Sequence, residues 1–131
     1  MRILHVAIAD DWEACRQFGE YSVSTRHKTF DDVGFIHAST ARQLRGTVDR
    51  VFGDLGLPLV VAVIDLDALA ADGIEVRWEA SDDEVFPHIY SPIPMDAPTV
   101  VAELHALRGP DGYVLPDVSA YDVVEEAPRL G

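Results

Sequence analysis

The sequence predicts a single α+β domain, covering residues 1–131, whose strands form a mixed or antiparallel sheet beside two main helices. The length of 131 residues is that of one domain, and 48% hydrophobic and 25% charged residues is an ordinary globular composition. The expected elements run strand, helix, strand, helix and then several strands, an order typical of α+β domains. No repeat, low-complexity tract or linker divides the chain.

The first two expected elements are a strand and a short helix. Residues 2–8, RILHVAI, are apolar and rich in β-branched residues, which indicates a buried strand. Asp10 and Glu13 have the spacing of a capping box, and Gly19 suits a helix end, so a helix is expected over residues 11–18. Its inner face carries three apolar residues: Trp12, Cys15 and Phe18.

A loop, a short strand and the main helix are expected next. Residues 20–32 are polar and have no period, so they predict a long loop, of a length that often covers a site. Residues 34–39 predict a short strand. Ser39 is a good N-cap for a helix over about residues 40–52. The inward stripe of this helix consists of four apolar residues: Leu44, Val48, Val51 and Phe52.

The second half is expected to consist mainly of strands. Residues 57–66, LPLVVAVIDL, are almost continuously apolar, which indicates a central strand covered on both faces. A helical turn over residues 67–73 and an alternating strand over residues 74–80 follow. Three prolines interrupt residues 85–94, so any strand there should be short or at a sheet edge. Residues 98–109 alternate again and predict a half-exposed strand.

The C-terminal part is expected to be less regular. Residues 109–112, GPDG, have the composition of a turn, and residues 113–131 are acidic and weakly patterned. We therefore expect one extra strand there, followed by a loose tail.

The charge of the chain is strongly negative and unevenly distributed. The formal net charge is −13. Residues 1–57 contain seven Lys and Arg against eight Asp and Glu, whereas residues 58–131 contain three against fifteen. A phosphate backbone or an anionic membrane should repel such a chain, so neither nucleic acid nor a membrane is expected as a partner. The nearly neutral first half could still form a local pocket for an anion, and the acidity of the rest favours solubility.

The cysteine count and the start of the sequence favour a cytoplasmic protein. Cys15 is the only cysteine, so an internal disulfide and a thiolate zinc site are both excluded, and Cys15 is expected to be a small buried hydrophobic residue. No run of about 18 apolar residues predicts a membrane span. The apolar stretch near the start ends at two aspartates and is too short for a signal peptide.

The segment GFIHAST, residues 34–40, places polar side chains where a strand meets a helix. A helix N-terminus presents free N–H groups and a partial positive charge. Ser39 and Thr40 add hydroxyl donors, and Arg42 lies in the expected first turn. His37, at the strand end, would point to the same space, so the segment predicts a cradle for a phosphate or carboxylate. Alternatively, Ser39 is only a cap and His37 is a half-buried structural histidine.

Two further pairs share a face of an expected strand. Arg77 and Glu79 lie two residues apart, and they could pair with each other or present a cation and a carboxylate to a ligand. His88 and Tyr90 share one face of the FPHIY segment, residues 86–90, where an imidazole and a phenol can hold a flat ring or a ribose hydroxyl. Both residue types are also common in half-buried cores.

Three histidines lie on three expected strands: His5, His37 and His88. If these side chains converge, they could bind a metal, bind a substrate or shuttle a proton, since the ordinary pKa of histidine is about 6.5. No two histidines have the close i,i+2 or i,i+4 spacing of a metal site, so no metal is expected. His27 in the loop and His105 on a peripheral strand receive no role.

Five motifs in this order resemble a small bacterial family, domain-of-unknown-function family 952. They are LHV near the start, WEAC…GEY, GFIHAST leading into a helix, VRWE, and FPHIYSPIP. The likeness covers about residues 2–104, and the succession of GFIHxST and FPHIYxP is specific. Residues 105–131 resemble an acidic C-terminal extension beyond the family-like core.

This resemblance implies a fold like that of ADP-ribosyltransferases, in which a split sheet surrounds a cleft that holds NAD. It implies that His5 occupies the first-strand position, which contacts the nicotinamide ribose. His37, together with Ser39 and Thr40, matches the second position of such a cleft.

The resemblance also implies a catalytic position on a late strand. Glu79 is the carboxylate that matches it, while His88 or Tyr90 could occupy the equivalent place instead. With a glutamate there, transfer of an ADP-ribosyl group is implied; without one, nucleotide binding or a related phosphate-transfer or hydrolytic reaction is implied.

The leading hypothesis is therefore a protein that binds NAD or another phosphorylated nucleotide, with ribosyl or phosphate transfer. Its catalytic residues would be His37, Glu79 and His88. Its ligand-binding residues would be His5, His37, Ser39, Thr40, Arg77 and Tyr90. Two alternatives remain open: a non-catalytic module that binds a small anion or a protein partner, and a histidine-based metal hydrolase.

Overall fold

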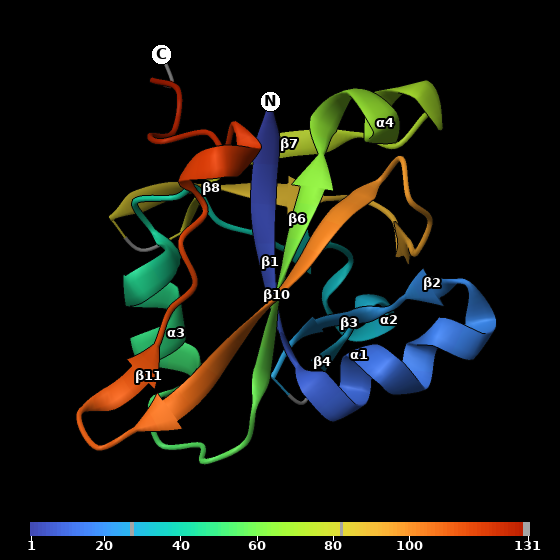
Figure 1. Ribbon diagram of the computed structural model, residues 1–131. Helices are drawn as coiled ribbons and strands as arrows, with labels where there is room; N and C mark the ends of the chain where they lie inside the picture. Colours follow the sequence, from blue (N-terminus) through green and yellow to red (C-terminus); the bar gives the residue numbers. More distant parts are fainter. Residues whose placement is uncertain (27, 82, 130–131) are drawn as a thin grey trace.

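The computed structural model, shown in Figure 1, describes residues 1–26, 28–81 and 83–129, so His27 lies outside the described residues. The α-helices are α1 (Ala9–Cys15), α2 (Phe30–Val33), α3 (Leu44–Phe52) and α4 (Leu66–Ala71), with 3₁₀ helices η1 (Arg16–Phe18) and η2 (Ser119–Tyr121). The strands are β1 (Arg2–Ile8), β2 (Glu20–Tyr21), β3 (Val23–Thr25), β4 (Lys28–Thr29), β5 (Ile36–His37), β6 (Leu59–Asp65), β7 (Val76–Ser81), β8 (Glu84–Ile89), β9 (Ile93–Pro94), β10 (Val100–Gly109) and β11 (Gly112–Val114). The chain is thus a single domain of mixed α and β content, as predicted.

The main sheet is antiparallel and has the strand order β1-β6-β10-β11. Its strand β6 lies between β1 and β10, and its side chains alternate between two apolar clusters. One cluster takes Val60, Ala62 and Ile64, and the other takes Leu59, Val61 and Val63. The prediction of a central strand covered on both faces is therefore confirmed.

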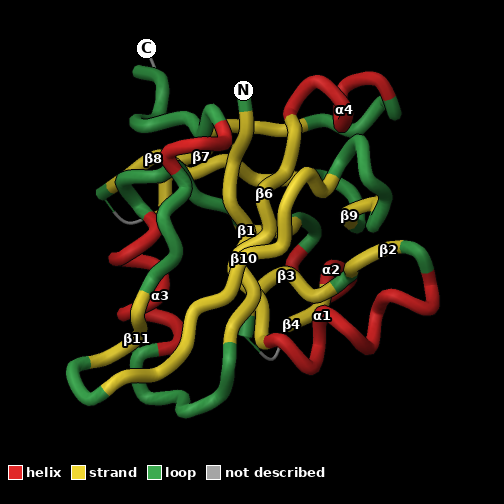
Figure 2. The backbone as a smooth tube through the Cα atoms, in the orientation of Figure 1, coloured by secondary structure: helices red, strands yellow, loops and turns green. Residues whose placement is uncertain are grey.

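Helices and short strands cover the two faces of this sheet. Helix α3 lies against one face, and α1 with β2, β3 and β4 lies on the other (Figures 1 and 2). Leu44, Val48 and Phe52 of α3 are buried in the first of these interfaces, which confirms the predicted inward stripe. On the opposite face, Trp12 and Tyr21 are buried and their rings lie 4.8 Å apart.

A smaller antiparallel sheet, with the order β5-β8-β7, is joined to the main sheet at one point. Leu4 and Ser39 exchange two backbone hydrogen bonds of 2.9 and 2.8 Å, which link β1 to the residues just after β5. The chain therefore curls from one sheet to the next, and the segment that follows His37 is buried between them. Among the described residues, no helix is long and apolar enough to cross a membrane.

Helix α1 begins two residues earlier than predicted. It begins at Ala9 directly after β1, and its N-cap residue, Ile8, makes no side-chain capping bond. The predicted cap at Asp10 is wrong because the strand leads straight into the helix, where the backbone N–H of Ala9 donates to the carbonyl of Pro58 at 3.0 Å. The final turn is a 3₁₀ helix, which leaves Phe18 73% exposed, while Gly19 ends it with a φ of 74° as expected. Cys15 is only half buried, beside the core.

The prediction of a long loop over residues 20–32 is also wrong. This stretch contains β2, β3, β4 and the start of α2. Thr29 and Asp32 form a reciprocal capping box at the start of α2, with hydrogen bonds of 3.3 and 3.1 Å. The threonine and aspartate are spaced as a capping box requires, and that was the sequence signal for this helix.

Helix α3 begins at Leu44, not near residue 40, so the predicted N-cap at Ser39 is wrong. The N–H groups of Ala41 and Arg42 donate instead to the carbonyls of Val124 and Glu125, at 2.8 and 3.3 Å. The C-terminal segment therefore takes the donors that an earlier helix start would have presented to a ligand. The expected loose tail is wrong for these residues, since Val124 is buried and also donates to the carbonyl of Arg2 at 2.8 Å.

Strand β8 lies in the middle of its sheet, although the prolines predicted a short or edge strand. Pro87 is paired with Trp78 of β7, and its carbonyl accepts a hydrogen bond from Ala38 at 3.0 Å, on the side of β5. In an antiparallel strand the N and C=O of one residue point to the same side, so the missing N–H of Pro87 takes no bond away from β7. Strand β5 ends at His37, so little pairing is lost on the other side.

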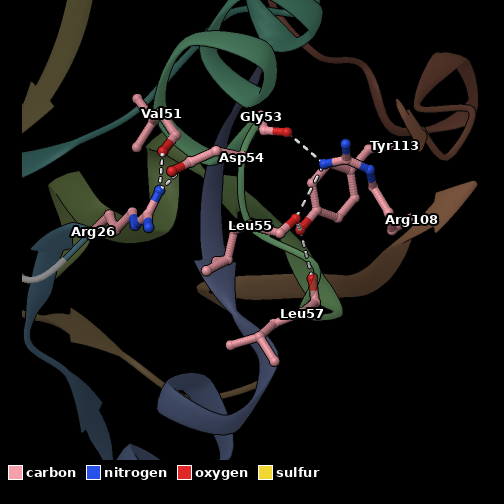
Figure 3. A network of polar contacts seen from close by, with 8 residues as sticks. All are labelled: Arg26, Val51, Gly53, Asp54, Leu55, Leu57, Arg108 and Tyr113. Atoms are coloured by element: carbon pink, nitrogen blue, oxygen red, sulfur yellow. Dashed lines mark hydrogen bonds and ion pairs between the residues drawn. The ribbon is translucent and has the colours of Figure 1, made fainter. Parts of the chain in front are cut away.

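The C-terminal end of α3 is held by three side chains from other elements (Figure 3). Arg26 donates to the carbonyl of Val51 at 3.2 Å and to Asp54 at 2.5 Å. Arg108 donates to the carbonyl of Gly53, and the Tyr113 hydroxyl contacts the carbonyls of Leu55 and Leu57 at 2.6 and 2.7 Å. These contacts compensate the partial negative charge at the helix end. They also fix the β3–β4 segment and the β10–β11 hairpin to α3.

Candidate functional site

One face of the three-stranded sheet gathers most of the predicted site residues. His37, His88 and Arg77 are direct partners across β5, β8 and β7. Because alternate residues of a strand share a face, their neighbours two positions away join them. We call this surface the His37 face, and it consists of Phe35, His37, Arg77, Glu79, Phe86, His88 and Tyr90.

Glu79 is the polar centre of the His37 face. Its Oε1 accepts a hydrogen bond from Nδ1 of His88 at 2.9 Å and a second one from the hydroxyl of Tyr90. The side chain is 37% exposed, and Oε2 has no donor among the described residues. The carboxylate is therefore fixed through one oxygen and offers the other to solvent or to a ligand.

These hydrogen bonds shift the ionisation of the residues that make them. The bond from Tyr90, and then that from His88, lower the pKa of Glu79 below its ordinary value. The same bond raises the pKa of Tyr90. Glu79 is consequently a carboxylate, and Tyr90 a neutral phenol, throughout the neutral pH range.

Aromatic and imidazole rings surround this carboxylate. Phe35 stacks on His88 with ring centroids 4.0 Å apart and an interplanar angle of 16°. The His37 ring lies 5.5 Å from that of His88 and 4.9 Å from that of Phe86. His88 is 4% exposed, and its Nε2 has no partner among the described residues, although Nδ1 is bonded to Glu79. The face therefore offers flat ring surfaces around the carboxylate, while Nε2 of His88 is buried behind them.

His37 is neutral at physiological pH. Burial lowers its pKa to about 4, and the neighbouring His88, His5 and Arg50 act in the same direction. A neutral imidazole can hydrogen-bond a ligand either as donor or as acceptor.

Arg77 is at the rim of the face. Its guanidinium pairs with the exposed Glu75 and lies 4.4 Å from the centre of the Tyr90 ring. It does not pair with Glu79 in the structure, although the two share a strand face. Arg77 is thus near the site, and its guanidinium is already paired with Glu75.

His5 is adjacent to the His37 face but buried behind it. Nδ1 of His5 donates to the backbone carbonyl of His37 at 2.7 Å, and its ring packs 5.2 Å from that of Tyr21. The side chain is 1% exposed, and burial lowers its pKa to about 4. His5 therefore supports the backbone of His37 and does not converge with the other two imidazoles on an open surface.

Ser39 and Thr40 also point away from any opening. The two hydroxyls of Ser39 and Thr47 are hydrogen-bonded at 2.9 Å, and Ser39 is 1% exposed. The Thr40 hydroxyl accepts from the backbone of Gln43, whose side chain accepts in return from the Thr40 N–H. The predicted phosphate cradle at the GFIHAST segment is wrong, because its hydroxyls and N–H groups are already bonded inside the protein.

A pocket of about 240 Å³ opens beside the His37 face, at the C-terminal end of α3. We call it the Arg50 pocket. Its lining consists of Ser24, Thr25, Lys28, Val33, Phe35, His37, Arg50, Val51 and Ser81. Phe35 and His37 thus belong to both the face and the pocket, so one ligand can reach both.

Several lining residues were not singled out from the sequence. The position of Phe35, two residues before His37, was a sequence signal, because strand alternation places both on one face. Lys28 and Arg50 gave no such signal, since their proximity depends on how the β3–β4 segment packs on α3. A larger groove of about 590 Å³ lies at the β10–β11 hairpin, and none of the predicted site residues lines it.

The described residues contain no group of three or more His, Cys, Asp or Glu side chains arranged to hold a metal ion. His37 and His88 are close, but the third predicted histidine, His5, is bonded to a backbone carbonyl in the interior.

The comparisons with known proteins identify a family and a fold. The family model described as "Protein of unknown function (DUF952)" matches residues 6–101. The crystal structure of protein CC0527 from Caulobacter crescentus is similar, with 26% sequence identity and a TM-score of 0.69, over 86% of this chain and 92% of that one. The solution structure of the same protein has 25% identity and a TM-score of 0.65, over 86% and 90%. No curated protein matches the chain.

Proposed function

We propose that this chain, which belongs to the DUF952 family of proteins of unknown function, binds NAD or a closely related phosphorylated nucleotide on the His37 face. The observation that carries the proposal is the arrangement around Glu79. A carboxylate held by His88 and Tyr90 is surrounded by flat rings, beside a pocket lined by cationic side chains. The resemblance to ADP-ribosyltransferases, read from the sequence motifs, adds the class of nucleotide.

The rings of the face suit the nicotinamide end of such a ligand. Phe35 and His37 are half buried and present ring surfaces to the Arg50 pocket. A flat heteroaromatic ring that packs against them gains free energy from the burial of its apolar surface. Ring stacking adds about 0.5–1.5 kcal/mol. Neutral His37 and the hydroxyl-bearing Tyr90 can hydrogen-bond an amide or a ribose hydroxyl.

The carboxylate suits a ribosyl-transfer reaction. When the bond between the ribose C1′ and the nicotinamide nitrogen breaks, the electron pair leaves with nicotinamide and positive charge develops on the ribose. An oriented anion near that carbon stabilises this charge, and Glu79 offers Oε2 for the purpose. Water or an acceptor hydroxyl then forms the new bond to C1′ and releases its proton to solvent, while His88 holds Glu79 in place through Nδ1.

The roles of three predicted residues change in this proposal. His5 positions the His37 backbone and does not contact the ligand, since it is buried. Ser39 and Thr40 are structural, because their hydroxyls are bonded inside the protein. His37, Glu79, His88, Arg77 and Tyr90 remain as proposed site residues.

Calorimetric titration with NAD, followed by chromatography of the products, tests this function. The wild-type protein should bind NAD and release nicotinamide. Glu79→Gln keeps the size of the side chain and should retain binding but slow nicotinamide release by about 100-fold or more. Glu126→Gln, a surface carboxylate that pairs with Arg42, is the matched control and should behave as wild type.

The outcomes separate binding from catalysis. Absence of any NAD binding at millimolar concentration would remove the proposal. Binding that His37→Ala abolishes, without nicotinamide release by the wild type, would favour the non-catalytic nucleotide-binding module over the transferase.

A further inference from the structure

The Arg50 pocket is unusually cationic for so acidic a protein. Lys28 and Arg50 both line it, and no Asp or Glu is among its described lining residues, whereas the chain as a whole carries a net charge of −13. Neither Lys28 nor Arg50 forms an ion pair with another described residue, although most other arginines of the chain do. Two cations that no acid of the described residues pairs with, beside one hollow, predict an anionic ligand there.

The side chain of Arg50 extends toward the His37 face. Its guanidinium carbon lies 5.7 Å from the centre of the Phe86 ring, and that ring is 4.9 Å from His37. The cation therefore sits where the helix end meets the proposed nucleotide site. A ligand whose ring lies on Phe35 and His37 can direct an anionic group to Arg50 without leaving the pocket.

A buried hydroxyl provides a second, independent observation. Ser24 of β3 lines the pocket, is 1% exposed, and its Oγ has no hydrogen-bond partner among the described residues. A buried polar atom without a partner costs about 1–3 kcal/mol. An anionic oxygen in the pocket would accept a hydrogen bond from the Ser24 hydroxyl and remove that cost.

The helix end beside the pocket does not oppose an anion. The C-terminal end of a helix carries a partial negative charge, and Val51 lines the pocket. Arg26 donates to the Val51 carbonyl, and Arg108 donates to that of Gly53 (Figure 3). These bonds compensate the helix end, so the charge of Arg50 is not needed for that purpose.

From these observations we propose that the Arg50 pocket is a phosphate subsite, in which Lys28, Arg50 and Ser24 hold the phosphate or diphosphate of the nucleotide. The proposal rests on the proposed function for the identity of the ring, but the subsite itself recognises the anion. It places the phosphates at the C-terminal end of α3, on the opposite end of that helix from the GFIHAST segment predicted from the sequence. The ligand class is thus a nucleotide with at least one phosphate beyond its ribose.

Calorimetric titration with inorganic pyrophosphate, and separately with NAD, tests the subsite. Arg50→Ala and Lys28→Ala should each weaken pyrophosphate binding about tenfold or more, as expected for a charge-assisted hydrogen bond. Ser24→Ala should weaken it by about threefold to tenfold. Arg42→Ala changes the net charge by the same amount at an exposed arginine paired with Glu126, and it should leave binding unchanged. Arg50→Gln should weaken pyrophosphate binding while it keeps a native NMR spectrum, which excludes a folding defect as the cause of the loss.

Each outcome bears on one proposal or the other. Pyrophosphate that does not bind to the wild type at millimolar concentration, or that binds Arg50→Ala as tightly as wild type, overturns the subsite. NAD binding that Arg50→Ala leaves intact overturns the subsite and keeps the nucleotide proposal. Arg50-dependent binding of pyrophosphate, without binding of NAD, supports the subsite and removes the nucleotide proposal.

Discussion

At the scale of single residues, Tyr90 sets the ionisation and the orientation of Glu79. Its hydroxyl donates to the same carboxylate oxygen that His88 contacts, and this bond is the first cause of the lowered pKa of Glu79. The second oxygen receives no hydrogen bond from the part of the chain that the structure describes. Glu79 is therefore a carboxylate that two side chains, His88 and Tyr90, fix through a single oxygen.

We predict that Tyr90→Phe raises the pKa of Glu79 toward its ordinary value, because one donor to the carboxylate is lost. The measurement is an NMR titration that follows the carboxyl carbon of Glu79. Tyr121→Phe is the control, since the Tyr121 hydroxyl makes no hydrogen bond to the described residues. An unchanged titration of Glu79 in Tyr90→Phe would show that the phenol does not act on the carboxylate in solution.

The buried histidines make stability depend on pH. Burial lowers the pKa of His5 to about 4 in the folded state, against about 6.5 in the unfolded chain. Between these values the unfolded chain binds more protons, so the free energy of unfolding falls as pH decreases from 6.5 toward 4, and is constant in this respect above 6.5. The slope approaches about 1.4 kcal/mol per pH unit for each such histidine. His37 contributes in the same direction.

We predict that His5→Asn flattens this dependence, because asparagine can still donate to the His37 carbonyl but does not titrate. Urea unfolding at several pH values between 4 and 7 gives the slope directly. The free energy of unfolding of the variant should be lower than that of wild type at pH 7. It should fall less steeply than that of wild type as the pH decreases from 7 to 4. An equally steep slope in the variant would mean that His5 is not the residue that titrates.

At the scale of elements, the end of α3 joins three parts of the chain. Arg26, Arg108 and Tyr113 come from the β3–β4 segment and the β10–β11 hairpin, and all contact carbonyls or Asp54 at this helix end (Figure 3). The Arg26 contact brings the segment that carries Ser24 and Lys28 against the helix that carries Arg50. The shape of the Arg50 pocket therefore depends on the Arg26 contacts at this helix end.

We predict that Tyr113→Phe lowers the free energy of unfolding by about 1 kcal/mol, because its hydroxyl is 2.6 and 2.7 Å from the carbonyls of Leu55 and Leu57. Urea denaturation measures the change. Ligand binding in this variant should remain as in wild type, because Tyr113 is on the hairpin and not in the Arg50 pocket. A large loss of ligand affinity with unchanged stability would contradict this division of roles.

Local pattern predicted some elements and not others, for identifiable reasons. The burial of β6 and α3 was predictable from the sequence. A continuous apolar run indicates a strand covered on both faces, and apolar residues at helical spacing indicate a helix buried on one face. The start of α3 was not, because the donors of Ala41 and Arg42 are taken by Val124 and Glu125, more than eighty residues away in the sequence. Pro87 is tolerated in a central strand because its nitrogen faces β5, which ends at His37, and not β7. This depends on the pairing register of the strands, which a single sequence does not show.

The candidate site shows the same division. Strand alternation predicted correctly that His88 shares a face with Tyr90, but it could not show that β7 lies beside β8 in a register that brings Glu79 to both. The burial of His5 and Ser39 follows from the bridge between the two sheets, a long-range contact. The expectation that three imidazoles meet in one pocket is therefore wrong for His5.

At the scale of the whole molecule, the C-terminal segment completes the domain. Arg2 exchanges backbone hydrogen bonds with Asp122 and Val124, at 3.0 and 2.8 Å, so η2 and the residues after it lie beside the start of β1 (Figure 1). The family match ends at residue 101, so this segment lies outside it, yet it occupies the N–H groups beside the GFIHAST segment. The segment thus takes a place where an anion was expected to bind.

We predict that truncation after Val118 lowers the free energy of unfolding by about 2–4 kcal/mol, through lost hydrogen bonds and the lost burial of Val124. Urea denaturation measures it. Truncation after Ala127 is the control and should have little effect, because the contacts with Arg2 and Ala41 remain. Equal stability of the two truncated proteins would show that residues 119–125 do not hold the domain together.

The most direct test of the proposed site is an NMR titration of the ¹⁵N-labelled wild-type protein with NAD, followed residue by residue. We predict shifts at Phe35, His37 and His88 from the ring, together with shifts at Ser24 and Lys28 from the phosphates. Spectra that stay unchanged at millimolar NAD, or shifts confined to the groove at the β10–β11 hairpin, would contradict a nucleotide site on the His37 face.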